Sequence, residues 1–321
     1  MKKIYLCAKS KNIKNVYATD DTVYTKEDVL SEPEKFKDTE YLFSTWGMPA
    51  FTEEEIKRCL PSLKAVFYGA GTVQDFARPF LNCGIKVFSA WAANAVPVAE
   101  YTVAQIVLAN KGFFSSNRLA KMGDRKAASQ CFHSYPGNYN VKIGIIGAGM
   151  IGKLVINMLK NYNLEVLVFD PFLPDEKAKE LGVKKVSLET VFRECQVVSN
   201  HLANNEQTKD LLGGSLFKKM LPYATFLNTG RGAQVVENDL IEVLKNRPDL
   251  TAVLDVTFPE PPTDDSEFYT LPNCILTPHI AGSAGNEVLR MGEYMKEEYK
   301  KFIQNEPCKY EVTLEMLKTM A

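Results

Sequence analysis

The chain has 321 residues, of which 45% are hydrophobic and 24% are charged, and this predicts a globular protein of two domains with sizeable cores. Its formal net charge of −1 excludes the broad basic surface that favours nucleic acid or an anionic membrane. We therefore expect a small-molecule ligand, no nucleic-acid partner and no membrane partner.

The seven cysteines are scattered, odd in number and without a C-x-x-C pair, so they predict neither a disulfide framework nor a zinc site. We interpret them as small buried hydrophobes in a reducing compartment, and we expect no metal. The apolar run Ile4–Ala8 is too short for a secretory signal, and we expect no stretch to be long enough to cross a bilayer. A cytoplasmic location is therefore expected.

Residues 1 to about 93 alternate short apolar runs with helical patterns. A helix is predicted over 52–60, with Thr52 as its N-cap and glutamates in its first turn. This alternation predicts a small parallel α/β domain. Its strands are predicted at Ile4–Cys7, Tyr41–Phe43, Ala65–Tyr68 and Lys86–Phe88.

Two loops of this region follow predicted strands. The backbone N–H groups of Gly69, Ala70 and Gly71 could hold an anion such as a carboxylate, although a plain strand-to-helix turn would read the same way. Trp46 lies where ligands bind in open α/β sheets, so it could line a substrate pocket or simply pack.

A long apolar helix is predicted from about Val96 to Phe114, with Pro97 in its first turn. Because it precedes the glycine-rich segment below, we expect it to carry the chain between domains. Ser115–Asn140 shows little regular period and is interpreted as an arm or irregular connection, with a solvated loop as the alternative.

The stretch Lys142–Asp170 has the pattern of a dinucleotide-binding unit. An apolar run ends in Gly147-Ala148-Gly149-Met150-Ile151-Gly152, a helical pattern follows, and a second apolar run ends in Asp170. The glycines permit a tight turn, backbone approach to a pyrophosphate and close helix packing, and the helix N-terminus favours negative charge. Asp170 could accept hydrogen bonds from a ribose. An ordinary glycine turn is the alternative reading.

The alternation continues to about residue 281, followed by a charged helix over 287–304. Further helices are predicted to begin near 186 and to cover 215–221 and 238–244. Six strands in all predict a doubly wound dinucleotide domain. After the first two, its strands are predicted at Gln196–Asn200, Ala224–Asn228, Thr251–Asp255 and Cys274–Thr277.

Polar residues follow these strands, and the ends of parallel strands share one edge of the sheet. Arginine suits a carboxylate or developing oxyanion, histidine can exchange a proton near neutral pH, and a carboxylate can orient that histidine. Arg231, Glu260 and His279 are therefore our candidate catalytic set, although each alone could be a capping or surface residue. His201 and Asp255 lie at the same predicted edge.

At these residues the chain resembles the D-2-hydroxyacid dehydrogenase family. The resemblance rests on G-A-G-M-I-G at 147–152, N-T-G-R-G at 228–232, D-V-T-F-P-E-P at 255–261 and T-P-H-I-A-G at 277–282. The segment Asn94–Glu100 also resembles the start of that family's interdomain helix.

The resemblance implies an α/β fold with two doubly wound parallel-sheet domains. A Rossmann NAD-binding domain over 95–286 is inserted in a smaller flavodoxin-like substrate domain formed by 1–94 and 287–321. It also implies NAD as cofactor, a small D-2-hydroxy or 2-oxo acid as substrate, and a homodimer with the long helix and the 115–140 arm at its interface. An NAD(H)-sensing binding protein or corepressor on the same fold is the alternative.

The resemblance also assigns roles by position. His279 would be the acid–base residue and Glu260 its partner, while Arg231 would bind the substrate's carboxylate and polarise its 2-oxo group. The carboxylate would also contact Gly69–Gly71, with Trp46 in the substrate pocket. The expected cofactor-binding residues are Gly147, Gly149, Met150, Ile151, Gly152, Asp170, His201, Thr229, Gly230 and Asp255.

Departures from the family pattern bear on the substrate. Phosphoglycerate dehydrogenases usually carry an arginine where this chain has Gly69, so phosphoglycerate is not favoured, and formate-specific relatives carry glutamine where this chain has Glu260. The family's His-x-Pro is His201-Leu202-Ala203 here, which leaves the role of His201 open.

Overall fold

A computed structural model describes residues 2–318 of the chain. The chain divides into two compact units, each with its own sheet. Unit 1 comprises Met1–Asn94 and Ser283–Ala321, and unit 2 comprises Ala95–Gly282. Each unit is described by itself below.

The sheet of unit 1 has six strands in the order β13-β5-β4-β3-β1-β2. The order 2-1-3-4-5 of its five parallel strands is the flavodoxin-like arrangement, and β13 adds an antiparallel edge. The four strands predicted in this region are present, whereas the two-residue strands β2 and β13 are too short to leave a period in the sequence. The strands are β1 (Lys2–Leu6), β2 (Val23–Tyr24), β3 (Thr39–Ser44), β4 (Ala65–Tyr68), β5 (Lys86–Ser89) and β13 (Glu311–Val312).

Helices cover both faces of this sheet. On one face Phe43, Phe67 and Phe88 form a row of stacked rings under Met291 and Met295 of the last long helix. The N-cap predicted at Thr52 is confirmed, because its hydroxyl accepts a hydrogen bond from Glu55 N. The helices are α1 (Ser10–Tyr17), α2 (Lys26–Ser31), α3 (Pro33–Phe36), α4 (Glu53–Cys59), α5 (Ala77–Asn82) and α14 (Val288–Ile303).

The sheet of unit 2 has seven parallel strands in the order β12-β11-β10-β9-β6-β7-β8. Numbered within the unit this is 7-6-5-4-1-2-3, the doubly wound order of dinucleotide-binding domains with one strand added. The strand added to the six-strand order is β12 at one edge. All six predicted strands are present, and the two-residue strand β8 is the one that was not predicted. The strands are β6 (Tyr139–Ile146), β7 (Asn163–Phe169), β8 (Lys184–Lys185), β9 (Val197–Asn200), β10 (Thr225–Asn228), β11 (Thr251–Leu254) and β12 (Cys274–Leu276).

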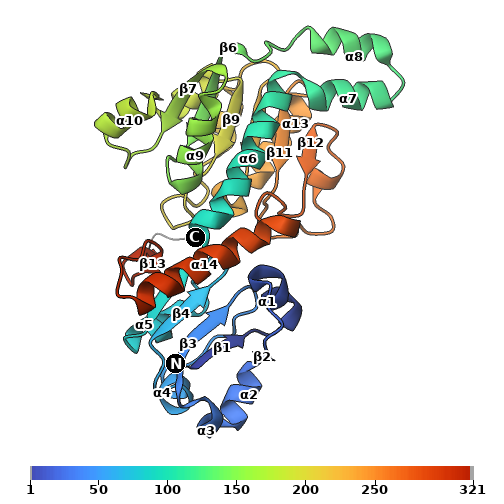
Figure 1. Ribbon diagram of the computed structural model, residues 1–321. Coiled ribbons are helices and arrows are strands. Elements are labelled where there is room, and N and C mark those ends of the chain that lie inside the picture. Colours follow the sequence, from blue (N-terminus) through green and yellow to red (C-terminus); the bar gives the residue numbers. More distant parts are fainter. Residues whose placement is uncertain (1, 319–321) are drawn as a thin grey trace. The chain divides into compact units, whose positions relative to one another are not determined.

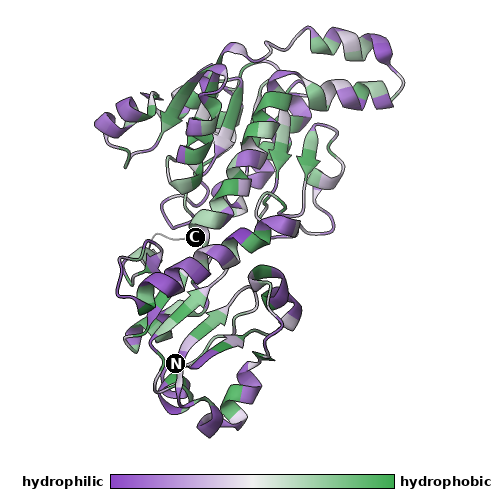
Figure 2. Cartoon of the chain, in the orientation of Figure 1, coloured by the Kyte–Doolittle hydropathy of each residue, from purple (hydrophilic) through white to green (hydrophobic). Residues whose placement is uncertain are grey.

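Two hydrophobic clusters lie on the two faces of this sheet, so its central strands are buried on both sides. Figure 2 shows the strands of both units as largely hydrophobic, with hydrophilic residues on the helices. The helices that cover the sheet are α6 (Trp91–Asn110), α9 (Met150–Leu159), α10 (Asp175–Leu181), α11 (Leu188–Glu194), α12 (Gly214–Phe217) and α13 (Glu237–Asn246).

Two predictions for the connecting region are wrong. The long helix α6 (Trp91–Asn110) begins before Val96, so Pro97 lies inside the helix and not in its first turn. The segment 115–140 is not irregular, since it contains most of α7 (Phe113–Lys121) and all of α8 (Arg125–Phe132), which lie side by side in Figure 1. Both helices are short, which leaves only a weak period in the sequence.

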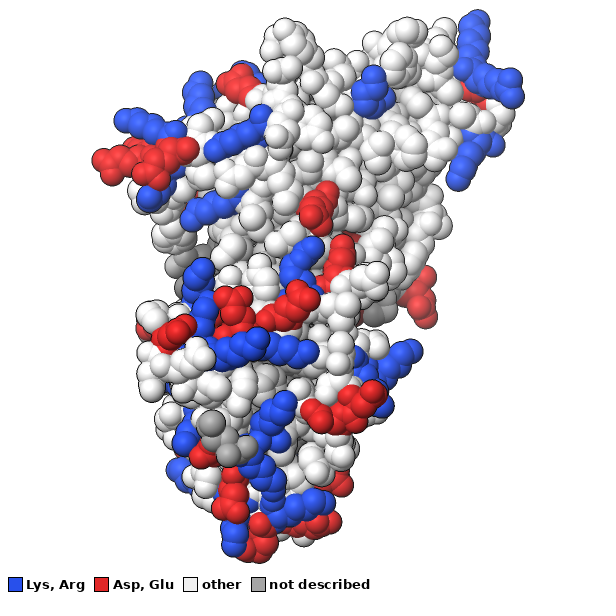
Figure 3. Space-filling view, viewed as in Figure 1, with Lys and Arg blue, Asp and Glu red and all other residues white. Residues whose placement is uncertain are grey.

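The 20 residues of α6 are long and apolar enough to span a membrane, contrary to the expectation that no stretch would be. The helix instead buries Ala99, Val103, Ile106 and Ala109 in the core of unit 2, so it is a buried core helix. Figure 3 shows acidic and basic side chains interspersed over the visible face, as the small net charge suggests. All seven cysteines are free thiols.

Candidate active site

The glycine-rich turn after β6 brings the start of α9 against the end of the strand. Gly147 has a φ of +90°, which favours glycine, and its N–H donates to Phe169 O at 2.8 Å. A Cβ on Gly152 would lie 2.0 Å from the carbonyl oxygen of Gly147, so only glycine permits this approach. Gly149 is the N-cap of α9, and a Cβ built there meets no atom within 4 Å. The helix N-terminus is therefore open to an anion.

Asp170 connects this turn to the end of β7. Its Oδ2 accepts a hydrogen bond from Ala148 N at 2.7 Å, and its Oδ1 accepts one from Phe172 N at 2.8 Å. Each carboxylate oxygen has a second acceptor position for a ribose hydroxyl. Beside it, Met150 in the first turn of α9 is 47% exposed, and Ile151 is half-buried.

The other predicted site residues of unit 2 follow β9 to β12, whose pairing sets their ends side by side. Asn200, Asn228 and Leu254 are register partners across β9, β10 and β11. Asp255 continues β11 and is 2% exposed. Its carboxylate accepts hydrogen bonds from the Thr277 hydroxyl at 2.7 Å, from Ile280 N at 2.8 Å and from Ala281 N at 2.9 Å. Asp255 thus holds the loop that carries His279.

The structure brings His279 and Glu260 together. Glu260 Oε1 lies 2.7 Å from His279 Nδ1, and the two side chains are 41% and 46% exposed. His279 N donates to Asp255 O at 3.0 Å, while Nε2 of its ring makes no hydrogen bond within residues 2–318. Glu237 supports the loop that carries Glu260, because its carboxylate accepts a hydrogen bond from Phe258 N at 2.8 Å. The pair therefore presents one ring nitrogen to a ligand and fixes the other.

Arg231 follows β10 and precedes the short 3-10 helix η1 (Gly232–Gln234). Its Nη1 donates to Gly230 O at 2.8 Å. Burial lowers the pKa of the Arg231 guanidinium, and the negative charge of Glu260 acts in the opposite direction. A guanidinium stays charged near neutral pH in such surroundings. Arg231 is thus a cation within electrostatic reach of the Glu260–His279 pair.

His201 lies at the same edge but is buried and fully engaged. Its Nε2 lies 2.8 Å from Ser199 Oγ, and its Nδ1 lies 3.4 Å from the hydroxyl of Thr229. Thr229 in turn lies 3.3 Å from Thr102 Oγ1 on α6. Burial lowers the pKa of His201 from 6.5 to about 3, so the ring is neutral at pH 7. These contacts identify a structural hydrogen-bonding group, and a direct cofactor contact of His201 stays a prediction.

The neutral His201 predicts acid sensitivity of the fold. Its pKa is about 3 when folded and ordinarily 6.5, so the unfolded chain binds more protons between these values. The free energy of unfolding should therefore fall with acidification, by up to about 1.4 kcal/mol per pH unit below 6.5. Urea unfolding of the native chain and His201→Gln at a series of pH values measures this, and the variant should show the shallower slope. Equal slopes would contradict it.

One of the three backbone N–H groups predicted to hold an anion in unit 1, that of Gly69, is already used within the protein. Gly69 N donates to Ser44 O at 2.7 Å, so this amide is not available to a ligand. The N–H groups of Ala70 and Gly71 make no hydrogen bond within the described chain, while their carbonyls accept from Ser89 Oγ at 2.8 and 2.6 Å. Trp46 is 40% exposed at the end of β3. The unpaired donors are therefore at 70 and 71, of which Ala70 is completely buried and Gly71 is partly exposed.

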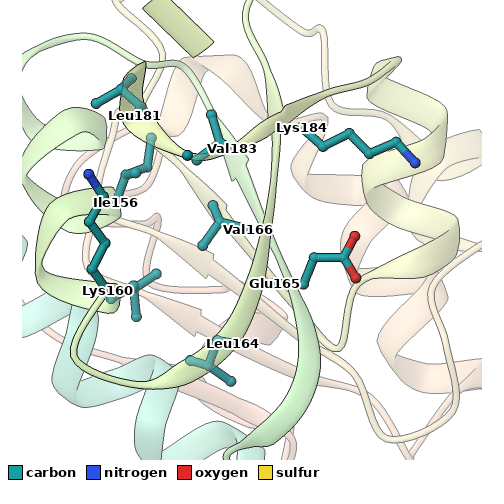
Figure 4. Close-up of a pocket in the computed structure, with 10 residues that line it drawn as sticks. Ile156, Lys160, Leu164, Glu165, Val166, Leu181, Val183 and Lys184 are labelled. Atoms are coloured by element: carbon teal, nitrogen blue, oxygen red, sulfur yellow. The ribbon is translucent and has the colours of Figure 1, made fainter. Parts of the chain in front are cut away.

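A cavity of about 430 Å³ in unit 2 lies elsewhere. Apolar side chains of α9, β7 and the α10–β8 connection line it, with Lys160, Glu165 and Lys184 beside them (Figure 4). Its β7 residues begin at Leu164, near the opposite end of that strand from Asp170. None of the predicted site residues lines it.

Some residues that build this edge were absent from the prediction. The side chains of Asn200 and Gln234 are completely buried beside the Arg231 loop, and Glu237 and Thr277 support the loops of Glu260 and His279. The only available signal was a polar residue next to an apolar run, as at Gln234 before Val235-Val236. Such a signal does not identify a bonding partner.

Comparison with known proteins assigns the chain to a family. The model of the family described as "D-isomer specific 2-hydroxyacid dehydrogenase, NAD binding domain" matches residues 103–281. A D-3-phosphoglycerate dehydrogenase of Archaeoglobus fulgidus is 30% identical over 231 residues, which are 72% of this chain but 43% of that protein. A glyoxylate reductase of Korarchaeum cryptofilum is 28% identical over 275 residues, 85% of this chain and 82% of that one.

Solved structures of 2-hydroxyacid dehydrogenases have a similar fold. A D-lactate dehydrogenase of Lactobacillus jensenii, solved with NAD+, superposes with a TM-score of 0.79 at 21% identity, covering 97% of this chain and 100% of that one. The chain spans about half the length of several curated relatives that it matches. The matched region contains the glycine-rich turn, Arg231, Glu260 and His279. This chain belongs to the D-isomer specific 2-hydroxyacid dehydrogenase family and contains its NAD-binding domain.

Proposed function

We propose that this protein catalyses hydride transfer between NAD(H) and a small D-2-hydroxy acid or 2-oxo acid, with His279 as the acid–base residue. The observation that supports it most is the 2.7 Å contact between Glu260 Oε1 and His279 Nδ1, with half-buried Arg231 in the same unit. An acid–base group, an orienting carboxylate and a fixed cation are what the reduction of a 2-oxo acid needs from a protein. The substrates named for the relatives differ, so the acid itself stays open.

The residues of unit 2 fit a dinucleotide. The open N-terminus of α9 at Gly149 suits the pyrophosphate, with Met150, Ile151 and Gly152 in the same turn, and Asp170 suits the adenosine ribose. Within residues 2–318, Asp255 Oδ2 accepts one hydrogen bond, from Ala281 N, and so retains a position for the nicotinamide carboxamide. Thr229 and Gly230 are proposed to border the cofactor. When bound, the nicotinamide supplies or accepts the hydride.

The chain's own groups handle the proton and the negative charge. In reduction, Nε2 of protonated His279 gives its proton to the 2-oxo oxygen, and Glu260 stabilises that charged form through Nδ1. In oxidation His279 accepts the proton from the hydroxyl. Arg231 binds the carboxylate of the substrate and polarises the 2-oxo group.

Unit 1 is proposed to be the substrate domain. The unpaired N–H of partly exposed Gly71 is suited to the carboxylate, with the unpaired N–H of buried Ala70 next to it, and exposed Trp46 is suited to the substrate's side chain. We further propose a homodimer that uses the α7–α8 hairpin, because this hairpin exposes Phe113, Met122 and Phe132.

A panel of 2-oxo acids with NADH tests the function directly. Glyoxylate, pyruvate, hydroxypyruvate and branched or aromatic 2-oxo acids are supplied in turn, and the loss of NADH absorbance is followed. At least one of them should be reduced with catalytic turnover. Tight NADH binding without turnover of any member would instead favour an NAD(H)-sensing protein on the same fold.

The cofactor preference is proposed to rest on Asp170. The 2′-phosphate of NADPH would approach this carboxylate, and the residues that follow, Pro171-Phe172-Leu173, offer no arginine to receive it. We expect kcat/KM to be at least about 10²-fold higher with NADH than with NADPH. Asp170→Ala should narrow the ratio, and comparable values for the two cofactors in the native protein would contradict this account.

A further inference from the structure

Three buried side-chain amides surround the Arg231 loop, and the proposed function does not use them. They are Asn200 at the end of β9, Asn228 at the end of β10 and Gln234 in η1, and we call them the amide cluster. Their exposed fractions are 0%, 1% and 0%. A buried amide costs free energy unless its polar atoms are paired, so the hydrogen bonds of the amide cluster show what it holds.

Gln234 uses all four of its hydrogen-bonding positions. Its Oε1 accepts from Asn200 Nδ2 at 2.6 Å and from Arg231 N at 3.3 Å. Its Nε2 donates to Leu202 O and Ala203 O, both at 2.9 Å. Because oxygen meets two donors and nitrogen meets two carbonyls, a flipped amide would lose all four bonds. The side chain therefore has one orientation.

The two asparagines complete the amide cluster. Asn200 Nδ2 also donates to Asn228 Oδ1 at 3.0 Å, and the same oxygen accepts from Gly230 N at 3.0 Å. Asn228 Nδ2 then donates to Arg231 O at 3.2 Å. The side chains of neighbouring strands are thereby joined to the backbone of a single loop.

These bonds converge on Arg231 from both sides. Gln234 holds its N–H and Asn228 holds its carbonyl, so both peptide planes that flank its Cα are fixed. Gly230 lies against the same amides, since a Cβ there would be 3.0 Å from Asn200 Nδ2 and from Gln234 Oε1. The guanidinium bonds back to Gly230 O at 2.8 Å. The direction of the arginine side chain thus depends on the amide cluster.

We propose that the amide cluster is a positioning device for Arg231, which sets the guanidinium for the carboxylate of the 2-oxo acid. This inference rests on the proposed function for the role of Arg231. Amides do not titrate near neutral pH, so the loop keeps one geometry over the pH range in which a histidine exchanges its proton. A catalytic or binding group that is misplaced by about 1 Å can lower the rate by about 10²-fold, so fixing the position of the guanidinium matters for turnover.

Gln234→Met tests the proposal, because methionine fills a similar volume and removes all four hydrogen bonds. We expect kcat/KM for the 2-oxo acid to fall between about 10-fold and 10²-fold, with the Kd for NADH unchanged within about twofold and the pH profile unmoved. In an Arg231→Ala background the same substitution should change kcat/KM by less than about twofold. Backbone amide exchange at Gly230 and Arg231 should become at least about 10-fold faster.

Asn273→Ala is the matched control. Asn273 is another buried amide of unit 2, and it donates to Leu244 O, Arg247 O and Leu250 O away from this loop. Its loss should lower stability and leave kcat/KM unchanged. If Gln234→Met does not fold, Asn200→Ser takes its place. The Asn200 side chain bonds to Gln234 and Asn228 but not to Arg231.

Equal losses of kcat/KM from Gln234→Met in the native and Arg231→Ala backgrounds would overturn the proposal, as would an equal loss in the control. If the native chain reduces no 2-oxo acid, the proposed function fails by itself. The exchange measurement then still decides the amide cluster: faster exchange confined to residues 230–231 supports it, and unchanged exchange overturns it.

Discussion

His279→Ala is expected to lower kcat for 2-oxo acid reduction by roughly 10²- to 10⁴-fold, the usual contribution of a general acid–base group. The variant removes the one hydrogen-bonded partner that Glu260 Oε1 has among residues 2–318, which lies at 2.7 Å. Both side chains are more than 40% exposed, so the fold should tolerate the change. The Kd for NADH should stay within about twofold, because the imidazole holds no predicted cofactor contact. Steady-state kinetics and NADH fluorescence titration measure the two quantities.

Two further variants define the role. Glu260→Gln keeps an acceptor for Nδ1 but removes the charge, so it should cost less in kcat than His279→Ala and move the pH profile. His133→Ala is the matched control, since His133 is an exposed histidine at the end of α8. Native kcat in the His279→Ala enzyme, or an equal loss in the His133→Ala enzyme, would refute the assignment.

Arg231→Ala is expected to lower kcat/KM by at least about 10³-fold, since it removes the charge that binds the carboxylate and polarises the 2-oxo group. Arg231→Lys keeps a positive charge without the planar pair of donors, and should recover only part of the loss. Kinetics with a 2-oxo acid and with the matching aldehyde, which lacks the carboxylate, separate the two effects.

The aldehyde provides the internal control for this series. The native enzyme should strongly prefer the acid, and Arg231→Ala should reduce that preference, because only the acid loses a charge partner. A preference that is unchanged in the Arg231→Ala enzyme would mean that another group binds the carboxylate. The free amides of Ala70 and Gly71 would then be the first donors to examine.

The edge of the unit 2 sheet that carries the candidate site could be predicted from the sequence, because each strand and the polar residue after it form a local sequence pattern. β10 occupies Thr225–Asn228, within one residue of the predicted range, and the glycine-rich turn, Arg231 and His279 each follow a recognisable apolar strand. Once the strands are parallel, their ends share one edge, so residues far apart in sequence fall together. The 2.7 Å contact of Glu260 with His279 is a product of this topology.

Two features that could not be predicted depend on hydrogen bonds between residues that are far apart in the sequence. Asn200 and Gln234 are 34 residues apart, and nothing local indicates that their amides bond at 2.6 Å. Gly69 resembled its two neighbours in the anion loop, yet its N–H is used by Ser44 O of the adjacent strand. The α7–α8 region read as irregular because its two helices have nine and eight residues. Short amphipathic segments leave weak periods.

The most direct test of the central claim follows the hydride itself. NADH deuterated at both C4 positions of the nicotinamide is incubated with the protein and an accepted 2-oxo acid, and the product is examined by mass spectrometry and chiral chromatography. The account predicts a D-2-hydroxy acid with one deuterium on C2. A product without deuterium, the L-isomer, or no product from any 2-oxo acid would contradict it.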